Sequence, residues 1–217
     1  MDAARQSALL ARQPRTVELL RAIGIMPILT VASVEQARMQ AEALLRGGLR
    51  GIEITLRTPA ALDAITALKR ALPELSIGAG TVLSAEQLQA AEGAGADFIV
   101  TPGTTATLRE ALAASLLPIV PGAATPSEVM ALAEYGFRVA KLFPASAVGG
   151  LAMLKALQGP LADFQLCPTG GLTEGDAPDY LALPNVACIG GSWMLSNDPA
   201  EVEQRAARCR AIVDARG

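Results

Sequence analysis

Short apolar runs of six or seven residues recur along the chain, and their starts lie 20 to 26 residues apart. Most of them end in Gly, Pro, Ser or Thr, and each has the length of a single β-strand. The pattern therefore predicts eight strands. They fall at residues 26–31, 51–56, 75–81, 97–102, 117–122, 138–143, 164–170 and 186–192.

The stretches between these runs are rich in Ala, Leu and Glu, and they predict helices. Several open with a residue suited to cap a helix N-terminus, and several close at glycine. A helix over 15–23 precedes the first strand, and an amphipathic helix over 199–215 follows the last. The predicted caps are Ser33, Thr58-Pro59, Ser84 and Thr125-Pro126, and the closing glycines are Gly47-Gly48, Gly93 and Gly136.

Eight strand–helix units, each about 22–25 residues long, predict an α/β fold of the (β/α)8 TIM-barrel type. We expect one domain over residues 1–217, with the helix at 15–23 closing the bottom of the barrel. Residues 1–14 are expected to be a flexible or helical extension. The structural alternative is a doubly wound open sheet, but no GxGxxG motif follows the first strand.

Alternation within two of the runs predicts which side chains point into the barrel. In GIEITLR, the polar residues Glu53, Thr55 and Arg57 alternate with Ile52, Ile54 and Leu56. Residues two apart on a strand share a face, so the polar set is expected to point inward and the aliphatic set toward the helices. The same reasoning applied to RVAKLF places Val139, Lys141 and Phe143 on the inner face.

Glu53 and Lys141 are the residues most suited to chemistry, because strands 2 and 6 face each other across an eight-stranded barrel. The chain has no histidine, which excludes Ser-His-Asp and Cys-His catalysis and histidine-ligated metal sites. A lysine in a confined site can become a neutral nucleophile, and a neighbouring carboxylate can shuttle protons. Taken alone, the two residues also fit a structural ion pair.

Polar groups at other strand ends fit an anionic substrate. Arg57 could hold a carboxylate in a two-pronged contact, or it could be a solvated arginine. Thr81 and Thr169 can donate hydrogen bonds from comparable positions. The last two strands end in PTGG and IGGS, and glycines after strands 7 and 8 of a barrel commonly bind phosphate through backbone N–H groups. That predicted site comprises Gly170, Gly171, Gly190, Gly191 and Ser192.

Composition and charge exclude several other classes of protein. A net charge of −3 with scattered Arg and Lys gives no case for nucleic acid. No apolar run approaches the roughly 18 residues of a membrane span, and the N-terminal segment does not resemble a secretory signal. Three cysteines without CxxC spacing indicate buried thiols in a cytoplasmic protein. No carboxylate cluster resembles a metal site, so we expect neither metal nor cofactor.

The ordered set of motifs resembles the bacterial 2-keto-3-deoxy-6-phosphogluconate (KDPG) aldolase family, which includes 4-hydroxy-2-oxoglutarate (KHG) aldolase activity. The resemblance covers roughly residues 25–195. It is carried by GGLRGIEITLRTPAAL (47–62), IGAGTVLSAEQL (77–88), FIVTPG (98–103), PIVPGAATPSEVM (118–130), KLFPA (141–145), CPTGGLT (167–173) and CIGGSW (188–193). Relatives often carry a basic residue just after the first strand, where this chain reads TVAS (30–33).

The resemblance implies a class I aldolase of the Entner–Doudoroff pathway that cleaves KDPG to pyruvate and glyceraldehyde 3-phosphate, usually as a homotrimer. It implies that Lys141 forms the Schiff base and that Glu53 is the acid/base. Substrate contacts would come from Arg57, Thr81 and Thr169, with Pro102 and Phe143 lining the pocket. The alternatives are a KHG aldolase, a non-catalytic phosphosugar-binding barrel and a phosphosugar isomerase or epimerase, of which the epimerase would require histidines for its metal.

Overall fold

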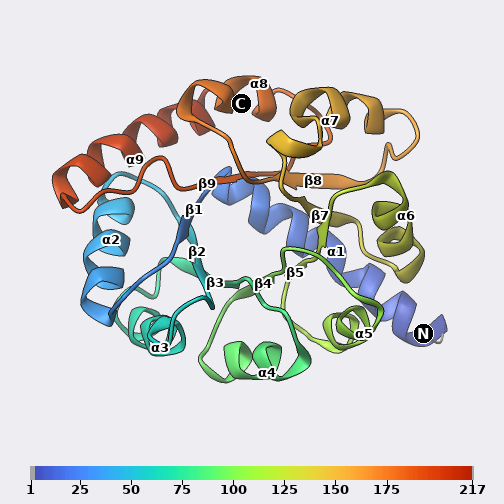
Figure 1. The fold of residues 1–217 in the computed structure, drawn as a ribbon, viewed down its shortest axis with the longest axis horizontal. Coiled ribbons are helices and arrows are strands. Elements are labelled where there is room, and N and C mark those ends of the chain that lie inside the picture. Colours follow the sequence, from blue (N-terminus) through green and yellow to red (C-terminus); the bar gives the residue numbers. More distant parts are fainter. Residues whose placement is uncertain (1–2, 217) are drawn as a thin grey trace.

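The chain folds into an α/β structure in which parallel strands are surrounded by helices (Figure 1). The computed structural model describes residues 3–216. Every predicted apolar run overlaps at least one strand. The strands are β1 (Ile25–Leu29), β2 (Gly51–Thr55), β3 (Ser76–Gly80), β4 (Phe98–Val100), β5 (Ile119–Val120), β6 (Gly122–Ala123), β7 (Val139–Leu142), β8 (Gln165–Pro168) and β9 (Ile189–Gly191).

The strands pair in parallel in two groups. Six of them follow the order β5-β4-β3-β2-β1-β9, and the other three follow the order β6-β7-β8. Two single bridges, Leu166 with Val186 and Thr169 with Gly190, link β8 to the segment that contains β9. The register places Glu53 of β2 beside Gly78 of β3.

The fifth predicted strand is interrupted at Pro121, so that β5 pairs with β4 and β6 pairs with β7. Proline has no N–H to donate to a ladder and is confined to edges and irregular positions of sheets. Its carbonyl oxygen still accepts a hydrogen bond from the backbone N–H of Lys141, at 2.9 Å. The run at 117–122 therefore contributes to both groups of strands.

The helices follow the strands in alternation, and their caps explain most of their bounds. Ser33, Ser84 and Thr125 accept hydrogen bonds from backbone N–H groups of the first turn, as predicted. The helices are α2 (Val34–Arg46), α3 (Ala61–Ala71), α4 (Ala85–Gly93), α5 (Ala106–Ala114), α6 (Pro126–Tyr135), α7 (Gly150–Gln158), α8 (Ala177–Leu181) and α9 (Pro199–Asp214), with 3₁₀ turns η1 (Ser146–Val148) and η2 (Glu174–Asp176).

The predicted cap at Thr58 is wrong. Helix α3 begins at Ala61 after Ala60, without a side-chain cap. The Thr58 hydroxyl donates instead to the carbonyl oxygen of Val31, at 2.7 Å. The threonine therefore ties the loop after β2 to the end of β1, a long-range contact that a local cap motif does not reveal.

Helix α1 (Ala3–Ile23) begins earlier than the predicted residue 15 and contains Pro14. Proline removes one helical hydrogen bond, which made this position a natural helix boundary in the sequence. The neighbouring Gln13 ties the helix to the rest of the fold at this point, because its side-chain nitrogen donates to Leu9 O and its oxygen accepts from the Arg138 N–H. Residues 1 and 2 of the predicted N-terminal extension lie outside the described residues.

Helix α1 passes across one end of the strands, where it meets their inward-facing residues (Figure 1). Its last turns contribute Leu20 and Ile23 to a buried cluster. The strand residues and strand-adjacent residues in this cluster are Met26, Phe98, Val100, Val120, Val139, Cys167, Ala187 and Cys188.

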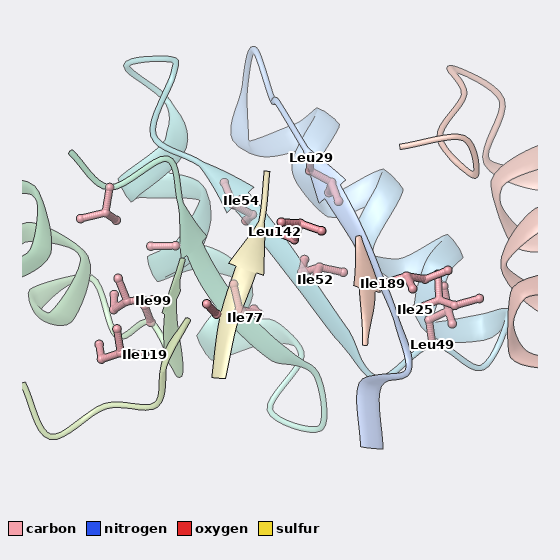
Figure 2. Close-up of a cluster of buried hydrophobic side chains, with 14 of the residues drawn as sticks. Ile25, Leu29, Leu49, Ile52, Ile54, Ile77, Ile99, Ile119, Leu142 and Ile189 are labelled. Carbon is pink, nitrogen blue, oxygen red and sulfur yellow. The ribbon is translucent and has the colours of Figure 1, made fainter. Parts of the chain in front are cut away.

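The main apolar core lies between the strands and the surrounding helices (Figure 2). Ile52 and Ile54 of β2 and Leu142 of β7 belong to it and are fully buried. Burying a side chain of this size contributes about 1.5–3 kcal/mol. Strand residues alternate between the two faces of a sheet. Glu53, between Ile52 and Ile54, and Lys141, next to Leu142, therefore point to the other side.

Within residues 3–216, no helix has both the length and the apolar character needed to cross a membrane.

Candidate active site

The side chains of Glu53 and Lys141 meet in the interior, although they are 88 residues apart in sequence. Lys141 Nζ lies 3.2 Å from Glu53 Oε1 and 3.4 Å from Oε2, which places the amine across both carboxylate oxygens. The side chains are only 6% and 3% exposed, respectively. A buried charge of either sign is costly without its partner, so each residue depends on the other.

Glycine in β3 makes room for the carboxylate. A Cβ atom at Gly80 would lie 2.0 Å from Glu53 Oε1 and 2.4 Å from Glu53 Cγ. Gly78, two residues earlier on the same face, leaves room in the same way for the ring of Phe98, whose nearest atom would be 2.1 Å from an added Cβ. The GAG sequence of β3 is therefore a packing requirement of the site and of the apolar layer beneath it.

Thr81 follows this strand in a left-handed backbone conformation, with φ at 58°. It is the one non-glycine residue with positive φ within residues 3–216. A β-branched residue in this region is strained, by about 1–3 kcal/mol, and strain of this kind concentrates at functional sites. Thr81 directly follows Gly80, which packs against Glu53.

A cavity of about 230 Å³ opens beside the pair and gathers most of the predicted substrate residues. Arg57 is the only charged side chain among the lining residues, which suits an anionic ligand. The lining residues are Ile28, Thr30, Arg57, Phe143, Thr169, Gly170, Gly171, Leu172, Gly191 and Ser192. The ring of Phe143 connects the cavity to the interior, because its centroid lies 5.4 Å from Lys141 Nζ.

Arg57 is exposed at the end of β2 and makes no ion pair or hydrogen bond to any described residue. Its guanidinium is therefore available for a ligand. The glycine-rich end of the cavity is formed by backbone held in place by neighbours. Gly170 and Gly171 have φ of 100° and 78°, and the Gly170 carbonyl oxygen accepts a hydrogen bond from the Ser146 N–H at 3.1 Å.

Three predicted residues do not line this cavity: Thr81, Pro102 and Gly190. Gly190 lies behind the cavity wall and forms a β-bridge with Thr169. A Cβ atom added to Gly190 would lie 2.5 Å from Thr169 Oγ1. Pro102 approaches Gly122 so closely that a Cβ on that glycine would lie 2.3 Å from the Pro102 carbonyl carbon. Both residues support neighbouring backbone in this structure.

Sequence reasoning missed Ile28, Thr30 and Leu172 as lining residues. Thr30 shares a hydrogen bond with Thr55, with 2.9 Å between the two hydroxyl oxygens, and Thr55 also donates to Leu29 O at 3.1 Å. The alternation placed Thr55 on the same face as Glu53, and this position could have indicated a partner at the end of the first strand.

The three cysteines are buried and unpaired. Burial raises the pKa of Cys188 well above its ordinary value, with a further contribution from neighbouring Cys167. Burial also raises the pKa of Cys209 to about 11. Since the thiolate is the nucleophile, Cys188 and Cys209 are inert near neutral pH. Residues 3–216 contain no group of three or more Cys, Asp or Glu side chains arranged to hold a metal ion.

Larger cavities lie elsewhere, and the two largest of those described each have about 450 Å³. One lies between α8 and α9 and has a mainly apolar lining, and the other lies near Arg21, Arg210 and Arg216. Neither brings a lysine and a carboxylate together. The cavity beside Lys141 and Glu53 is therefore the better candidate for chemistry, although it is smaller.

Comparison with known proteins places these observations in a family. Residues 17–209 match the family model described as KDPG and KHG aldolase. A Pseudomonas aeruginosa protein named 2-dehydro-3-deoxy-phosphogluconate aldolase is 48% identical over 177 residues, which cover 82% of this chain and 80% of that protein.

Two solved structures have closely similar folds. The KDPG aldolase of Zymomonas mobilis ZM4 with 3-phosphoglycerate has a TM-score of 0.89 at 38% identity and covers 92% of this chain and 97% of its own. The KDPG aldolase of Legionella pneumophila, with pyruvate captured as a covalent carbinolamine, has a TM-score of 0.83 at 38% identity and the same coverage.

Proposed function

The chain belongs to the KDPG and KHG aldolase family, and on that basis we propose that Lys141 and Glu53 catalyse a Schiff-base aldol cleavage. The substrate would be KDPG, and the products pyruvate and glyceraldehyde 3-phosphate. The observation that carries the proposal is the buried contact between Lys141 Nζ and Glu53, 3.2 Å long, beside a cavity whose one charged lining residue is Arg57. A structural ion pair alone would not require that cavity.

The first half of the reaction joins the substrate to the enzyme. A proton passes from Nζ to the Glu53 carboxylate and leaves a neutral amine, which attacks the C2 ketone. The carbinolamine loses water as Glu53 returns the proton, and an iminium forms at Lys141.

The second half breaks the carbon–carbon bond. Glu53, directly or through a water molecule, accepts the proton of the C4 hydroxyl, and the C3–C4 electron pair moves into the iminium to form an enamine. The aldehyde leaves, Glu53 protonates the enamine at C3, and hydrolysis releases pyruvate and frees Lys141. General acid–base help of this kind is worth roughly 10²–10⁴-fold in rate.

The remaining lining residues would hold the two anionic ends of the substrate. The guanidinium of Arg57 would bind the carboxylate, with hydroxyl groups of Thr169 and Thr81 nearby. Backbone N–H groups at Gly170, Gly171 and Gly191 and the hydroxyl of Ser192 would bind the phosphate, with Phe143 as an apolar wall and with Gly190 and Pro102 supporting the neighbouring backbone. The reaction as written uses no metal or organic cofactor.

We further propose that the strands close into an eight-stranded barrel with α1 across its bottom. The two bridges between β8 and the β9 segment support closure, as does the sharing of residues 117–123 between both groups of strands. Packing of Leu20 and Ile23 among inward-facing strand residues supports the role of α1. A homotrimer in the cytoplasm is proposed with it, and sedimentation of the purified protein tests the trimer.

A second candidate is cleavage of 4-hydroxy-2-oxoglutarate, which the family description also includes. That substrate has no phosphate but shares the α-keto acid end, so the same Lys141 and Glu53 chemistry applies. Measuring kcat/KM for the two substrates side by side separates the candidates. A preference for the phosphorylated compound supports KDPG, and the reverse supports the alternative.

Borohydride reduction with pyruvate, followed by mass spectrometry, tests the chemistry. A pyruvate-sized adduct on Lys141 is expected, and Lys141→Ala should abolish both adduct and turnover. Lys155→Ala is the matched control, because Lys155 is exposed on α7 and should leave both unchanged. Glu53→Gln should slow turnover by roughly 10²–10⁴-fold while some adduct still forms. An adduct on Lys69 or Lys155, or none at all, would refute the assignment, and phosphate binding without any adduct would favour a non-catalytic phosphosugar-binding protein.

A further inference from the structure

Residues 192–198 connect β9, at the proposed phosphate-binding end of the candidate site, to helix α9. It begins at Ser192, which lines the cavity together with Gly191. Within the segment, Leu195 N–H donates to Ser192 O at 3.0 Å and Asp198 N–H donates to the Ser196 hydroxyl at 3.2 Å. Residues 192–198 contain no regular secondary structure, so contacts from outside the segment must hold its path.

Met194 is buried in the apolar core, and Arg205 of α9 supplies the main polar contacts. Its Nη1 atom donates to the carbonyl oxygens of Trp193 and Leu195, each at 3.0 Å, and Nη2 pairs with Glu201 one turn earlier on the helix. The Arg205 side chain is 30% exposed, so these bonds form largely out of water. Gln40 of α2 reaches the same segment more weakly, at 3.5 Å from Ser196 O.

Trp193 links these hydrogen bonds to the cavity wall. Its ring packs on the Cα atom of Gly191, where an added Cβ would lie only 1.9 Å from the ring. Peptide groups are planar, so holding the Trp193 carbonyl also fixes the plane of the peptide that follows it. A shift of Trp193 would therefore move Gly191 and Ser192 on the other side of the contact.

We infer that Arg205 is a positioning residue for the phosphate-binding end of the site, acting through Trp193 and Leu195 on Gly191 and Ser192. The inference rests on the proposed function, because it assumes that this end of the cavity binds phosphate. The guanidinium does not line the cavity and touches no reacting atom. Its hydrogen bonds reach the cavity only through the segment that follows Gly191 and Ser192.

Steady-state kinetics of Arg205→Met on two substrates test the inference. With KDPG, we expect KM to rise by about tenfold, equivalent to ~1.4 kcal/mol, with kcat nearly unchanged. With 4-hydroxy-2-oxoglutarate, which lacks the phosphate, kcat/KM should stay within about twofold of wild type. Inorganic phosphate should inhibit the variant about tenfold more weakly than it inhibits wild type.

Two further variants keep the result interpretable. Arg205→Lys retains the charge and N–H donors and should recover part of the KM effect. Arg210 lies on the same helix, and Arg210→Met removes an ion pair with Asp214. This variant should leave KM and kcat unchanged for both substrates. Equal losses on both substrates, or no change on KDPG in a folded Arg205→Met protein, would overturn the inference. Failure of the wild-type protein to cleave either substrate would instead refute the proposed function.

Discussion

Replacing Gly80 by alanine should disable the Glu53–Lys141 pair by adding a single methyl group. The added Cβ would lie 2.0 Å from Glu53 Oε1, 2.4 Å from Cγ and 2.5 Å from Cδ, whereas ordinary contacts begin near 3.4 Å. The Glu53 side chain must therefore move by about 1 Å or more. Gly80 does not have a positive φ, so alanine introduces no backbone strain of its own.

The displacement should affect activity much more than folding. A misplacement of 1 Å in a catalytic group can cost about 10²-fold in rate, and complete loss of acid–base help costs up to roughly 10⁴-fold. We therefore expect kcat to fall by between about 10²- and 10⁴-fold. Overpacking should lower the free energy of unfolding by about 1–3 kcal/mol, offset in part by the 0.4–1 kcal/mol that alanine gains over glycine in the unfolded chain.

The assay couples pyruvate release to NADH oxidation and is paired with urea denaturation of the same samples. Gly93→Ala is the matched control, because no atom lies within 4 Å of a Cβ there and the residue ends α4. A Gly80→Ala protein with kcat within about twofold of wild type would refute the reasoning, since Glu53 then either moves freely or takes no part in the chemistry.

Two other perturbations separate stability from function. Thr81→Gly relieves the strain of φ at 58° and should raise the urea midpoint slightly, because the relief of about 1–3 kcal/mol exceeds the unfolded-state cost of glycine. The same variant should lower kcat/KM, because it loses the threonine hydroxyl. Lower stability together with full activity would contradict both expectations. Asp176 accepts hydrogen bonds from the Thr173 hydroxyl and N–H, which lower its pKa below the ordinary 3.8. A lowered folded-state pKa adds stability at pH values above the unfolded-state pKa, and this gain is lost as the pH falls through the folded-state pKa. Because the carboxylate is well solvated, Asp176→Asn should lower the free energy of unfolding by less than about 1 kcal/mol at pH 7, and by progressively less below pH ~4. Chemical denaturation at several pH values measures this, and a pH-independent difference would exclude the charge-dependent part of this cap.

Local patterns in the sequence predicted much of the architecture. The spacing of apolar runs located the strands, because a strand buried on both faces needs a short apolar stretch between turn residues. Ser33, Ser84 and Thr125 cap helices where predicted, since an N-cap hydrogen bond joins residues only three apart. Alternation in β2 and β7 assigned Glu53 and Lys141 to one face and their aliphatic neighbours to the other.

Long-range packing decided what these patterns could not. Thr58 bonds to the end of β1 rather than capping a helix, and Gln13, beside Pro14 within α1, has a distant partner in Arg138. Neither contact has a local signature, since the partner residues lie 27 and 125 positions away.

The site shows the same division. Alternation within two strands and the absence of histidine pointed to Lys141 and Glu53 as the candidate catalytic pair. Their 3.2 Å contact, the space above Gly80 and the reach of Arg205 to the segment after β9 exist only in the folded chain. Residue type determines which chemistry is available, whereas distances between side chains on separate strands depend on how every strand and helix packs together.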